Sequence, residues 1–386
     1  MNKLIYFRAT ELIKHDNDIV NNKKIGKWLA PHLAISYAGS FTRSRSCDTI
    51  PNLDFLAPAI SKMPLAGELG VFDSFENIFD SLITQYCVEF AQHNKTIYLS
   101  WSGGIDSTTI VTGFLKNAPK EILERIEILC NEDSIIENPY FYHMFLKDKF
   151  KQHRINDFLL DDTTVNDSII IDGEAGNQCM GNNIIAKLVF SNRLDVLLKP
   201  WRQEKNLNQL LVIENKWLSL VPNVDDAVTY WVNQLLATVP YCPVELVTIY
   251  DLFWWANFDM KFNDVLLRKI PGYAFNLTNT GTKTLWDHAL IRPFASKEMQ
   301  CWSILSKDAR AEMTPIDLKY FSKKYILDFD KNYHYFEYKT ETASKGISAR
   351  SVSSLVFAID TEWNKYTLQR RADRQFLGKL ILEDNL

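Results

Sequence analysis

A glycine-containing string, Ser-Gly-Gly-Ile-Asp-Ser at residues 102–107, is the feature that most constrains the fold of this chain. It follows a short apolar run, Ile97-Tyr98-Leu99, and precedes a run that continues to Lys116. Paired glycines permit a sharp turn and a close approach of another group to the main chain. The string therefore predicts a tight turn from a strand into a helix.

The predicted turn is suited to binding phosphate, because a helix N-terminus presents unpaired N–H groups and a partial positive charge. The string is not a Walker motif, since the Gly-Lys-[Ser/Thr] ending is absent. A plain glycine turn with a helix-capping aspartate is the alternative. The residues expected to contact phosphate are Ser100, Ser102, Gly103, Gly104, Ile105, Asp106, Ser107 and Thr108.

Asp106 is unusual in such a place, because a carboxylate inside a phosphate cradle would repel the ligand. A magnesium ion between the two groups removes the conflict, since Mg²⁺ prefers one or two carboxylates together with phosphate oxygens. Glu174 follows a later apolar run, in the segment Asp172–Gly181. Ligands of parallel sheets bind beyond the carboxyl ends of the strands. We therefore expect Asp106 and Glu174 to share one magnesium ion, although a plain turn also explains the later segment.

Strand-like and helix-like segments alternate in this part of the chain. The predicted elements are helices at 75–90, 107–116 and 138–152, and strands at 96–100, 126–130 and 169–171. Asp73 or Ser74 offers an N-cap for the first helix. Strands that alternate with helices indicate βαβ units, so the predicted fold class is α/β, with helices on both faces of a parallel sheet.

The two ends of the chain differ from this segment. Residues 1–72 predict a small, strand-containing N-terminal region. Residues 73–386 are expected to form one larger domain, with a sheet core at about 95–185 and a mainly helical part at about 186–386. The helical part is rich in tryptophan, and large aromatic side chains at helical spacing are expected in the core.

Together, the two glycine-containing segments resemble the synthetase domain of the asparagine synthetase family, within the pyrophosphate-loop ATP-cleaving enzymes. That family pairs Ser-Gly-Gly-x-Asp-Ser with a later Gly-Glu-Gly-Ala-Asp-Glu segment. It then carries an Arg-x-Pro-Phe-like string and a lysine before an Ile-Leu pair. Ile291–Phe294 and Lys324–Leu327 occupy these places, so the resemblance covers about residues 74–340. It implies an adenine nucleotide α-hydrolase-like fold.

The resemblance also implies a reaction. A substrate carboxylate attacks the α-phosphate of ATP to give an acyl-adenylate and pyrophosphate, and an amine then displaces AMP to form an amide. The cofactors implied are ATP and Mg²⁺, and the substrates are small-molecule or peptide carboxylates and amines.

Individual residues receive roles from the same resemblance. Gly173 and the strand end at Cys130 would contact the nucleotide, with adenine read by backbone groups. Asp106 and Glu174 would hold the metal. Lys324 and Glu174 are the expected catalytic residues, with Lys324 neutralising charge on the α-phosphate. Lys323 stands beside it, and the register leaves open which lysine faces the site. For the Arg-Pro-Phe string at 292–294 a structural role is favoured, with the phenylalanine packed beneath the turn.

Two departures from the family pattern limit these expectations. Residue 2 is Asn2, whereas members that hydrolyse glutamine carry a nucleophilic cysteine there after removal of methionine. The N-terminal region of about 70 residues is also short for a glutaminase domain. Asn177 stands where the family has Asp, which removes a carboxylate from the expected metal site. We therefore expect no glutamine hydrolysis, with nitrogen coming from an amine or ammonia.

Composition narrows the class of protein. A formal net charge of −4 does not favour a nucleic-acid partner. No apolar stretch approaches the length of about 20 residues that a membrane span needs. The 6 cysteines are scattered singly, which suggests neither a zinc site nor a disulfide framework. The sequence therefore predicts a cytoplasmic protein without membrane or nucleic-acid partners, for which a protein partner or a homo-oligomer stays open.

Two other functions compete with the ligase. One is a nucleotide-binding or scaffold protein with a weakened active site, which Asn177 favours. The other is an adenylating enzyme that acts on a different acceptor, such as a tRNA base, which the acidic balance of charge disfavours.

Overall fold

The structure is a computed structural model of the chain, and it describes the greater part of residues 63–339. The described residues are 43, 63–155, 158, 160–181, 185, 188–189, 193–204, 207–211, 224–267, 273, 277, 281, 284–314, 318–339, 369–370 and 376–377. Most of the predicted N-terminal region, together with Trp217 and Trp363, lies outside the described residues.

Contacts divide the chain into two compact units whose boundaries differ from those expected from the sequence. One unit comprises residues 64–181 and 272–351, and we call it the sheet unit. The other comprises residues 1–63, 182–271 and 352–386, and we call it the helical unit. The segment 272–351 returns to the sheet unit because it supplies the last strand of the sheet.

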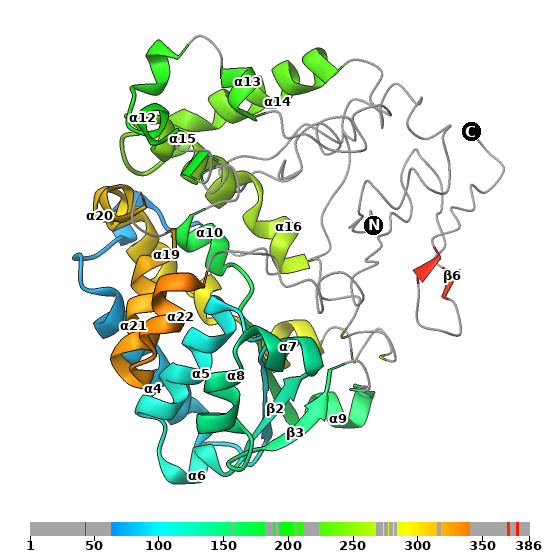
Figure 1. The fold of residues 1–386 in the computed structure, drawn as a ribbon. Coiled ribbons are helices and arrows are strands. Elements are labelled where there is room, and N and C mark those ends of the chain that lie inside the picture. Colours follow the sequence, from blue (N-terminus) through cyan, green and yellow to red (C-terminus); the bar gives the residue numbers. More distant parts are fainter. Residues whose placement is uncertain are drawn as a thin grey trace, which may run out of the picture. The chain divides into compact units, whose positions relative to one another are not determined.

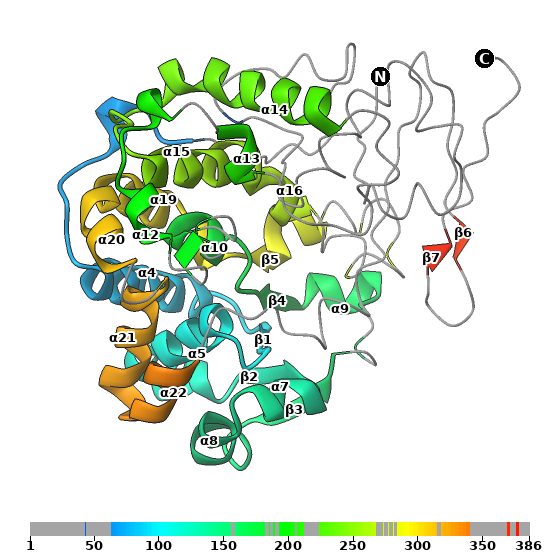
Figure 2. The ribbon, with the colours of Figure 1, turned by 45° about the horizontal axis from the view of Figure 1, so that its top comes forward.

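A five-stranded parallel sheet forms the centre of the sheet unit (Figures 1 and 2). The strands are β1 (Thr96–Ser100), β2 (Ile126–Cys130), β3 (Lys151–Arg154), β4 (Ser168–Ile171) and β5 (Leu290–Ile291). Their order is β3-β2-β1-β4-β5, and all neighbours run parallel. Strands β1 and β4 are neighbours at the point where the chain order reverses, which is where open parallel sheets bind ligands.

Helices connect and cover the strands of the sheet unit. In its first part these are η1 (Ala66–Glu68), α4 (Phe75–Phe90), α5 (Ile105–Asn117), α6 (Lys120–Leu123), α7 (Glu132–Glu137), α8 (Pro139–Phe141), η2 (Tyr142–Leu146), α9 (Asp162–Asn166) and α10 (Gly176–Met180). In its second part they are η8 (Leu285–Ala289), η9 (Pro293–Ala295), α19 (Lys297–Leu305), α20 (Lys307–Met313), α21 (Tyr320–Asp330) and α22 (Tyr333–Tyr338).

The two faces of the sheet are covered by different helices (Figure 2). Tyr98 and Ile170 point to one face, where they pack with apolar residues of α9 and η8. Side chains alternate along a strand, so Ile97 and Leu99 point to the opposite face, and both are fully buried. The predicted α/β class with helices on both faces is therefore confirmed.

Helices α4 and α5, on either side of the glycine string, are stabilised by an N-cap and by close packing, respectively. Ser74 caps α4 by accepting a hydrogen bond from the N–H of Asn77 at 3.1 Å. Helix α4 packs on α5 through Phe79 and Ile83, which lie so close to Gly113 that a Cβ there would be 2.9 Å from each. The predicted helix at 107–116 is observed from Ile105 to Asn117.

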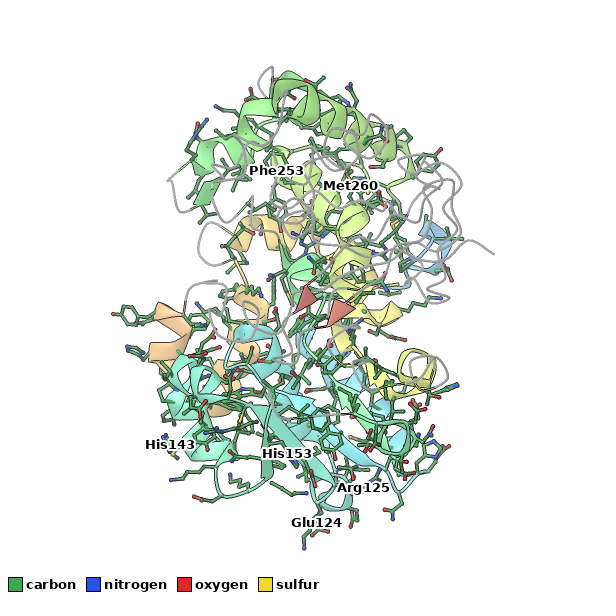
Figure 3. All side chains as sticks on the ribbon, turned by 90° about the vertical axis from the view of Figure 1, so that its right-hand side faces the viewer. Glu124, Arg125, His143, His153, Phe253 and Met260 are labelled. Carbon is green, nitrogen blue, oxygen red and sulfur yellow. The ribbon has the colours of Figure 1, made fainter. Side chains whose placement is uncertain are left out.

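The predicted helix at 138–152 is wrong in its last third. The helical segment ends in η2 at Leu146, and Lys151–Arg154 forms the edge strand β3 beside β2. Sequence periodicity missed this strand because all four of its side chains are polar. His153, labelled in Figure 3, contacts Glu127 of β2, and Lys151 pairs with the same carboxylate at 3.0 Å.

The helical unit is described by itself. Its elements are α12 (Leu194–Leu197), η3 (Trp201–Gln203), α13 (Leu207–Leu211), α14 (Val224–Thr238), η5 (Val239–Tyr241), α15 (Ile249–Trp255), η6 (Ala256–Met260) and α16 (Phe262–Leu267), with the short antiparallel pair β6 (Gln369–Arg370) and β7 (Phe376–Leu377). Trp254 and Trp255 are fully buried, and the indole of Trp255 donates to Thr238 Oγ1 at 2.9 Å. For these two residues the expected core position is confirmed.

Candidate functional site

The string at residues 102–107 forms the turn between β1 and α5, as the sequence predicts. Gly103 adopts φ +75°, and a Cβ there would be 2.3 Å from the carbonyl oxygen of Ser134. Only glycine fits this position, because both the backbone conformation and the space exclude a side chain. The turn is held from the other side by Tyr335 of α22, whose hydroxyl donates to the carbonyl oxygen of Gly103 at 3.1 Å.

Serine hydroxyls fix the inside of this turn. Ser107 Oγ accepts from the N–H of Ser102 at 3.0 Å and donates to the carbonyl oxygen of Gly104 at 3.1 Å. The hydroxyl of Ser102 lies 3.0 Å from the same Oγ. Ser107 and Ser102 are thus engaged with the turn itself, which makes them parts of its scaffold as well as candidate ligand contacts.

The first turn of α5 leaves donors available for a ligand. The N–H groups of Ile105, Asp106 and Ser107 make no hydrogen bond to any part of the chain that the structure describes. Thr108 is different, because its N–H closes the helix onto Gly104 and its hydroxyl accepts from the indole of Trp101 at 3.1 Å. Three successive unpaired N–H groups at a helix N-terminus are a favourable environment for phosphate oxygens.

The segment after β4 lies directly against this turn. A Cβ at Gly176, the first residue of α10, would lie 2.3 Å from Cγ of Asp106. A Cβ at Gly173 would lie 3.2 Å from Cβ of Asp106. Glu174, between these glycines, is buried, with 8% of its surface exposed. The structure therefore brings together the two segments that carry Asp106 and Glu174.

Asp106 has one engaged and one unpaired carboxylate oxygen. Its Oδ2 accepts from the ammonium of Lys319 at 2.7 Å, and the side chains are 19% and 6% exposed, respectively. Its Oδ1 is buried and has no hydrogen-bond partner among the described residues. An unpaired buried carboxylate oxygen is costly, so it indicates a position where a cation or a donor belongs.

The structure does not bring Lys324 to this carboxylate. Lys324 lies on the outer face of α21 with 49% of its side chain exposed, and its ammonium pairs with Asp328 on the same helix at 2.7 Å. This hydrogen bond to Asp328 raises the pKa of Lys324. Lys323 is buried, but it donates to the carbonyl oxygen of Lys339 at 3.0 Å. The lysine at Asp106 is Lys319, just before α21. The catalytic role expected of Lys324 stays a prediction.

A further lysine, Lys339, which the sequence patterns do not indicate, lies at the rim of the turn. The ammonium of Lys339 pairs with the carboxylate of Glu137 at the end of α7, and both side chains are nearly buried. Glu137 Oε1 would lie 3.5 Å from a Cβ on Gly104. The turn therefore lies between two lysine–carboxylate pairs, one at Asp106 and one at Glu137. Spacing does not reveal this arrangement, because residues 319 and 339 reach the turn only through the packing of α21 and α22.

The remaining predicted site residues occupy strand ends near the turn. Ser100 ends β1 and is buried, and Cys130 ends β2 with its carbonyl oxygen accepting from the N–H of Ile155 at 3.0 Å. Burial raises the pKa of the Cys130 thiol to about 11, so this side chain is neutral near pH 7. Ile105 packs with Ile326 of α21 and with Tyr335. It anchors the turn, and any ligand contact from Ile105 comes from its backbone.

Arg292, in the string after β5, makes a buried ion pair at the end of β4. Its Nε lies 3.1 and 3.2 Å from the two carboxylate oxygens of Asp172. Phe294 is fully buried against Phe79 of α4, with ring centroids 5.6 Å apart. The structural role predicted for this string is confirmed for Phe294, whereas Arg292 is directed toward the β4 turn.

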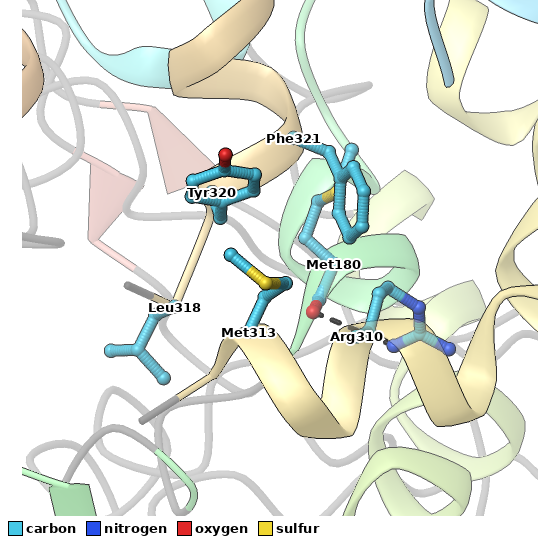
Figure 4. A pocket seen from close by; sticks show the side chains of 6 residues that line it. All are labelled: Met180, Arg310, Met313, Leu318, Tyr320 and Phe321. Atoms are coloured by element: carbon cyan, nitrogen blue, oxygen red, sulfur yellow. Dashed lines mark hydrogen bonds between the residues drawn. The ribbon is translucent and has the colours of Figure 1, made fainter. Parts of the chain in front are cut away.

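A small pocket lies between the end of α10, α20 and the start of α21 (Figure 4). Its walls are Met180, Arg310, Met313, Leu318, Tyr320 and Phe321. Met180 ends α10, the helix whose first residue contacts Asp106.

The acidic groups of the site allow a test of the expected metal. No cluster of three or more metal-ligating acidic, histidine or cysteine side chains occurs among the described residues. Asn177, where the resemblance leads one to expect a carboxylate, lies on α10 and is half-buried. Two carboxylates, one with an unpaired buried oxygen, fit Mg²⁺, because this ion takes its other ligands from phosphate and water.

No protein-family model and no characterised protein matches this sequence. Among the described residues no helix has the length and apolarity that a membrane crossing requires.

Proposed function

We propose that the chain is an ATP-dependent, AMP-forming ligase that adenylates a carboxylate and joins it to an amine or to ammonia. Asparagine synthetase-like enzymes, which the motifs resemble, catalyse this class of reaction. The substrates are small-molecule or peptide carboxylates and amines.

One observation carries the proposal. The turn after β1, with three unpaired N–H groups, lies against the turn after β4, with Asp106 and Glu174 on the two segments. This is the switch point of the sheet, where nucleotides bind in open α/β folds. A phosphate cradle together with an acidic pair is suited to a nucleotide that arrives with a divalent cation.

Different residues of the turn would then bind pyrophosphate and the metal ion. The N–H groups of Ile105, Asp106 and Ser107 donate to the leaving pyrophosphate, and Gly103 keeps the backbone close enough for them to do so. Asp106 and Glu174 would hold Mg²⁺, which when bound spreads the negative charge of the phosphates and makes pyrophosphate a better leaving group. Glu174 is buried and the Asp106 side chain is only 19% exposed, so the limited access of water strengthens the electrostatic interactions of both carboxylates.

The two lysines flanking the turn supply positive charge. Lys319 lies on the Asp106 side, and Lys339 lies on the Gly104 side in a pair with Glu137. Negative charge that develops on the phosphates during attack by a carboxylate would be stabilised by such fixed cations. We propose that Lys319 and Lys339 supply the positive charge that the resemblance assigns to Lys324.

Release of pyrophosphate together with AMP tests the proposal. The full chain is incubated with Mg-ATP and a panel of carboxylic acids and amines, and AMP is separated from ADP. We expect AMP and pyrophosphate in equal amounts with a productive pair, and a loss of about 10²–10³ in rate for Asp106→Ala. Asp328→Ala is the matched control, because Asp328 is an exposed aspartate paired with lysine outside the turn.

The other outcomes are informative. Formation of ADP in place of AMP contradicts cleavage between the α- and β-phosphates. Tight binding of ATP without AMP across the whole panel identifies a nucleotide-binding or scaffold protein. Equal activity of the Asp106→Ala and Asp328→Ala variants removes Asp106 from the site.

A further inference from the structure

The turn after β4 contains an unusual backbone conformation. Ala175 has φ +71°, and Lys331 is the one other non-glycine residue with positive φ in the described part of the chain. The left-handed conformation brings the Cβ of an L-residue too close to the next carbonyl, which lowers its population roughly five- to thirtyfold. Such conformations persist where surrounding contacts hold them. Ala175 lies between Glu174 and the start of α10. The contacts that hold Ala175 in this conformation therefore also determine the position of Glu174.

Asp172 supplies the contacts on one side of the turn. Its Oδ1 accepts from the N–H of Glu174 at 3.0 Å, which bends the chain directly after β4. Its own N–H donates to the carbonyl oxygen of Ile291 at 3.2 Å, which ties the turn to β5. The Asp172 carboxylate is therefore the point from which the position of Glu174 is set.

Arg292 fixes that carboxylate. Its Nε lies 3.1 Å from Oδ1 and 3.2 Å from Oδ2 of Asp172, and the side chains are 7% and 1% exposed. A carboxylate with so little access to water depends on its cation, because the charged group cannot recover solvation where it lies. Without Arg292, the Asp172 side chain would be driven to turn outward toward water. Its hydrogen bond to the N–H of Glu174 would then weaken.

The opposite side of the turn leaves no room for adjustment. Hydrogen is the largest substituent that fits on Gly176 beside the Asp106 carboxylate. A small rotation of the turn therefore either presses on Asp106 or moves away from it. The relative placement of Asp106 and Glu174 thus depends on the backbone at Ala175.

We propose that Arg292 is a positioning residue, which holds the strained turn at Ala175 through Asp172 and so keeps Glu174 beside Asp106. The catalytic importance of Glu174 rests on the proposed function. The claim that Arg292 holds the turn at Ala175 does not depend on that function.

Amide hydrogen exchange of the full chain without nucleotide tests the structural content. In Arg292→Gln we expect exchange at residues 173–181 to rise by at least about tenfold, while exchange in α4 stays as in the unaltered protein. Arg125→Gln is the matched control, because Arg125 donates to the carbonyl oxygens of Lys95 and Phe90 at the other end of the strands. An equal rise in α4 and in 173–181 would mean general destabilisation and would overturn the proposal.

Ala175→Gly provides the decisive second variant, because glycine adopts positive φ without penalty. In the Arg292→Gln background it should lower exchange at 173–181 about fivefold or more. If Ala175→Gly leaves exchange in that background unchanged, Arg292 does not act on the turn. Should Arg292→Gln fail to fold, Arg292→Lys serves in its place, since it keeps the charge and loses the Nε geometry.

Activity adds a separate readout. We expect Arg292→Lys to raise the Mg²⁺ concentration for half-maximal pyrophosphate release about tenfold, with a smaller change in the maximal rate. Equal loss of rate at every Mg²⁺ concentration contradicts positioning of Glu174. If the unaltered protein releases no pyrophosphate, the proposed function fails, and the exchange measurements still decide the role of Arg292.

Discussion

Two lysine–aspartate ion pairs, whose lysines lie five residues apart along the chain, have the same N–O distance but differ in burial and in the sequence separation of the partners. Lys319 and Asp106 are 2.7 Å apart and nearly buried, and they join segments 213 residues apart. Lys324 and Asp328 are also 2.7 Å apart, but they lie exposed on a single helix. Water screens the exposed pair, whereas the buried charges depend on each other. Burial, and not distance, therefore distinguishes the two pairs.

Removing the ammonium of Lys319 should have the largest effect. In Lys319→Ala the Asp106 carboxylate loses its cation in a nearly buried position, so we expect unfolding free energy to fall by about 3–5 kcal/mol. Pyrophosphate release should fall about 10²–10³-fold. Denaturant unfolding and initial rates measure the two effects. Unchanged activity in a folded Lys319→Ala protein would return the catalytic role to another lysine.

Gly176→Ala breaks the same site from the opposite side and leaves Lys319 in place. The added Cβ would overlap the Asp106 carboxylate, and such overpacking typically costs about 1–3 kcal/mol. We expect a loss of pyrophosphate release of about tenfold or more, because Asp106 must move away. Gly67→Ala is the control, since a Cβ there meets nothing within 4 Å. Similar rates for both alanine variants would show that the two turns are not in close contact.

Lys324→Ala sharpens the comparison through the weaker pair. The exposed pair between residues four apart on a helix contributes about 0.3–0.5 kcal/mol, and added salt reduces this further. Thermal unfolding at low and at 1 M salt should show a small difference that disappears, with rates within about twofold of the unaltered protein. A large loss of activity would contradict the assignment of the site to Lys319.

Thiol alkylation compares a buried cysteine, Cys130, with a half-buried one, Cys242, and we expect it to show the smallest of these effects. Burial raises the pKa of Cys130 to about 11, so its thiolate is scarce at pH 8 and increases about tenfold per pH unit until that value is reached. Cys242 is only half-buried. Mass spectrometry after iodoacetamide treatment at pH 8 should find Cys242 modified before Cys130. Faster modification of Cys130 would show that the β2 end is open to solvent.

Sequence patterns predicted local structure well where periodicity and capping were strong. The helix at Phe75–Phe90 with its Ser74 cap, the strands β1, β2 and β4, and the turn at 102–107 were all expected. The edge strand β3 was missed, because its polar side chains carry no alternation between apolar and polar residues. Its pairing with β2 is a tertiary interaction, which local patterns do not record.

In the candidate site, too, local sequence indicates the acidic residues, whereas helix packing determines which lysines lie near the turn. The sequence indicates Asp106 from its place in the glycine string and Glu174 from its place after a predicted strand, yet only the order of the strands makes β1 and β4 neighbours. The lysine that pairs with Asp106 is not the one that the motif indicates, because a motif does not specify which face of α21 points inward. Lys319 precedes the helix, and Lys339 follows α22, so their approach to the turn depends on how both helices pack.

By itself, the sequence determined that a glycine turn joins a buried strand to a helix, and that two acidic residues follow strands of a parallel sheet. These features depend on residues close together in the chain, where backbone freedom, capping and side-chain alternation act. Only the tertiary structure decided that Lys319 is the cation at Asp106 and that Arg292 pairs with Asp172. Those contacts join residues more than one hundred positions apart, and they form where burial removes the water that would otherwise keep the charges separate.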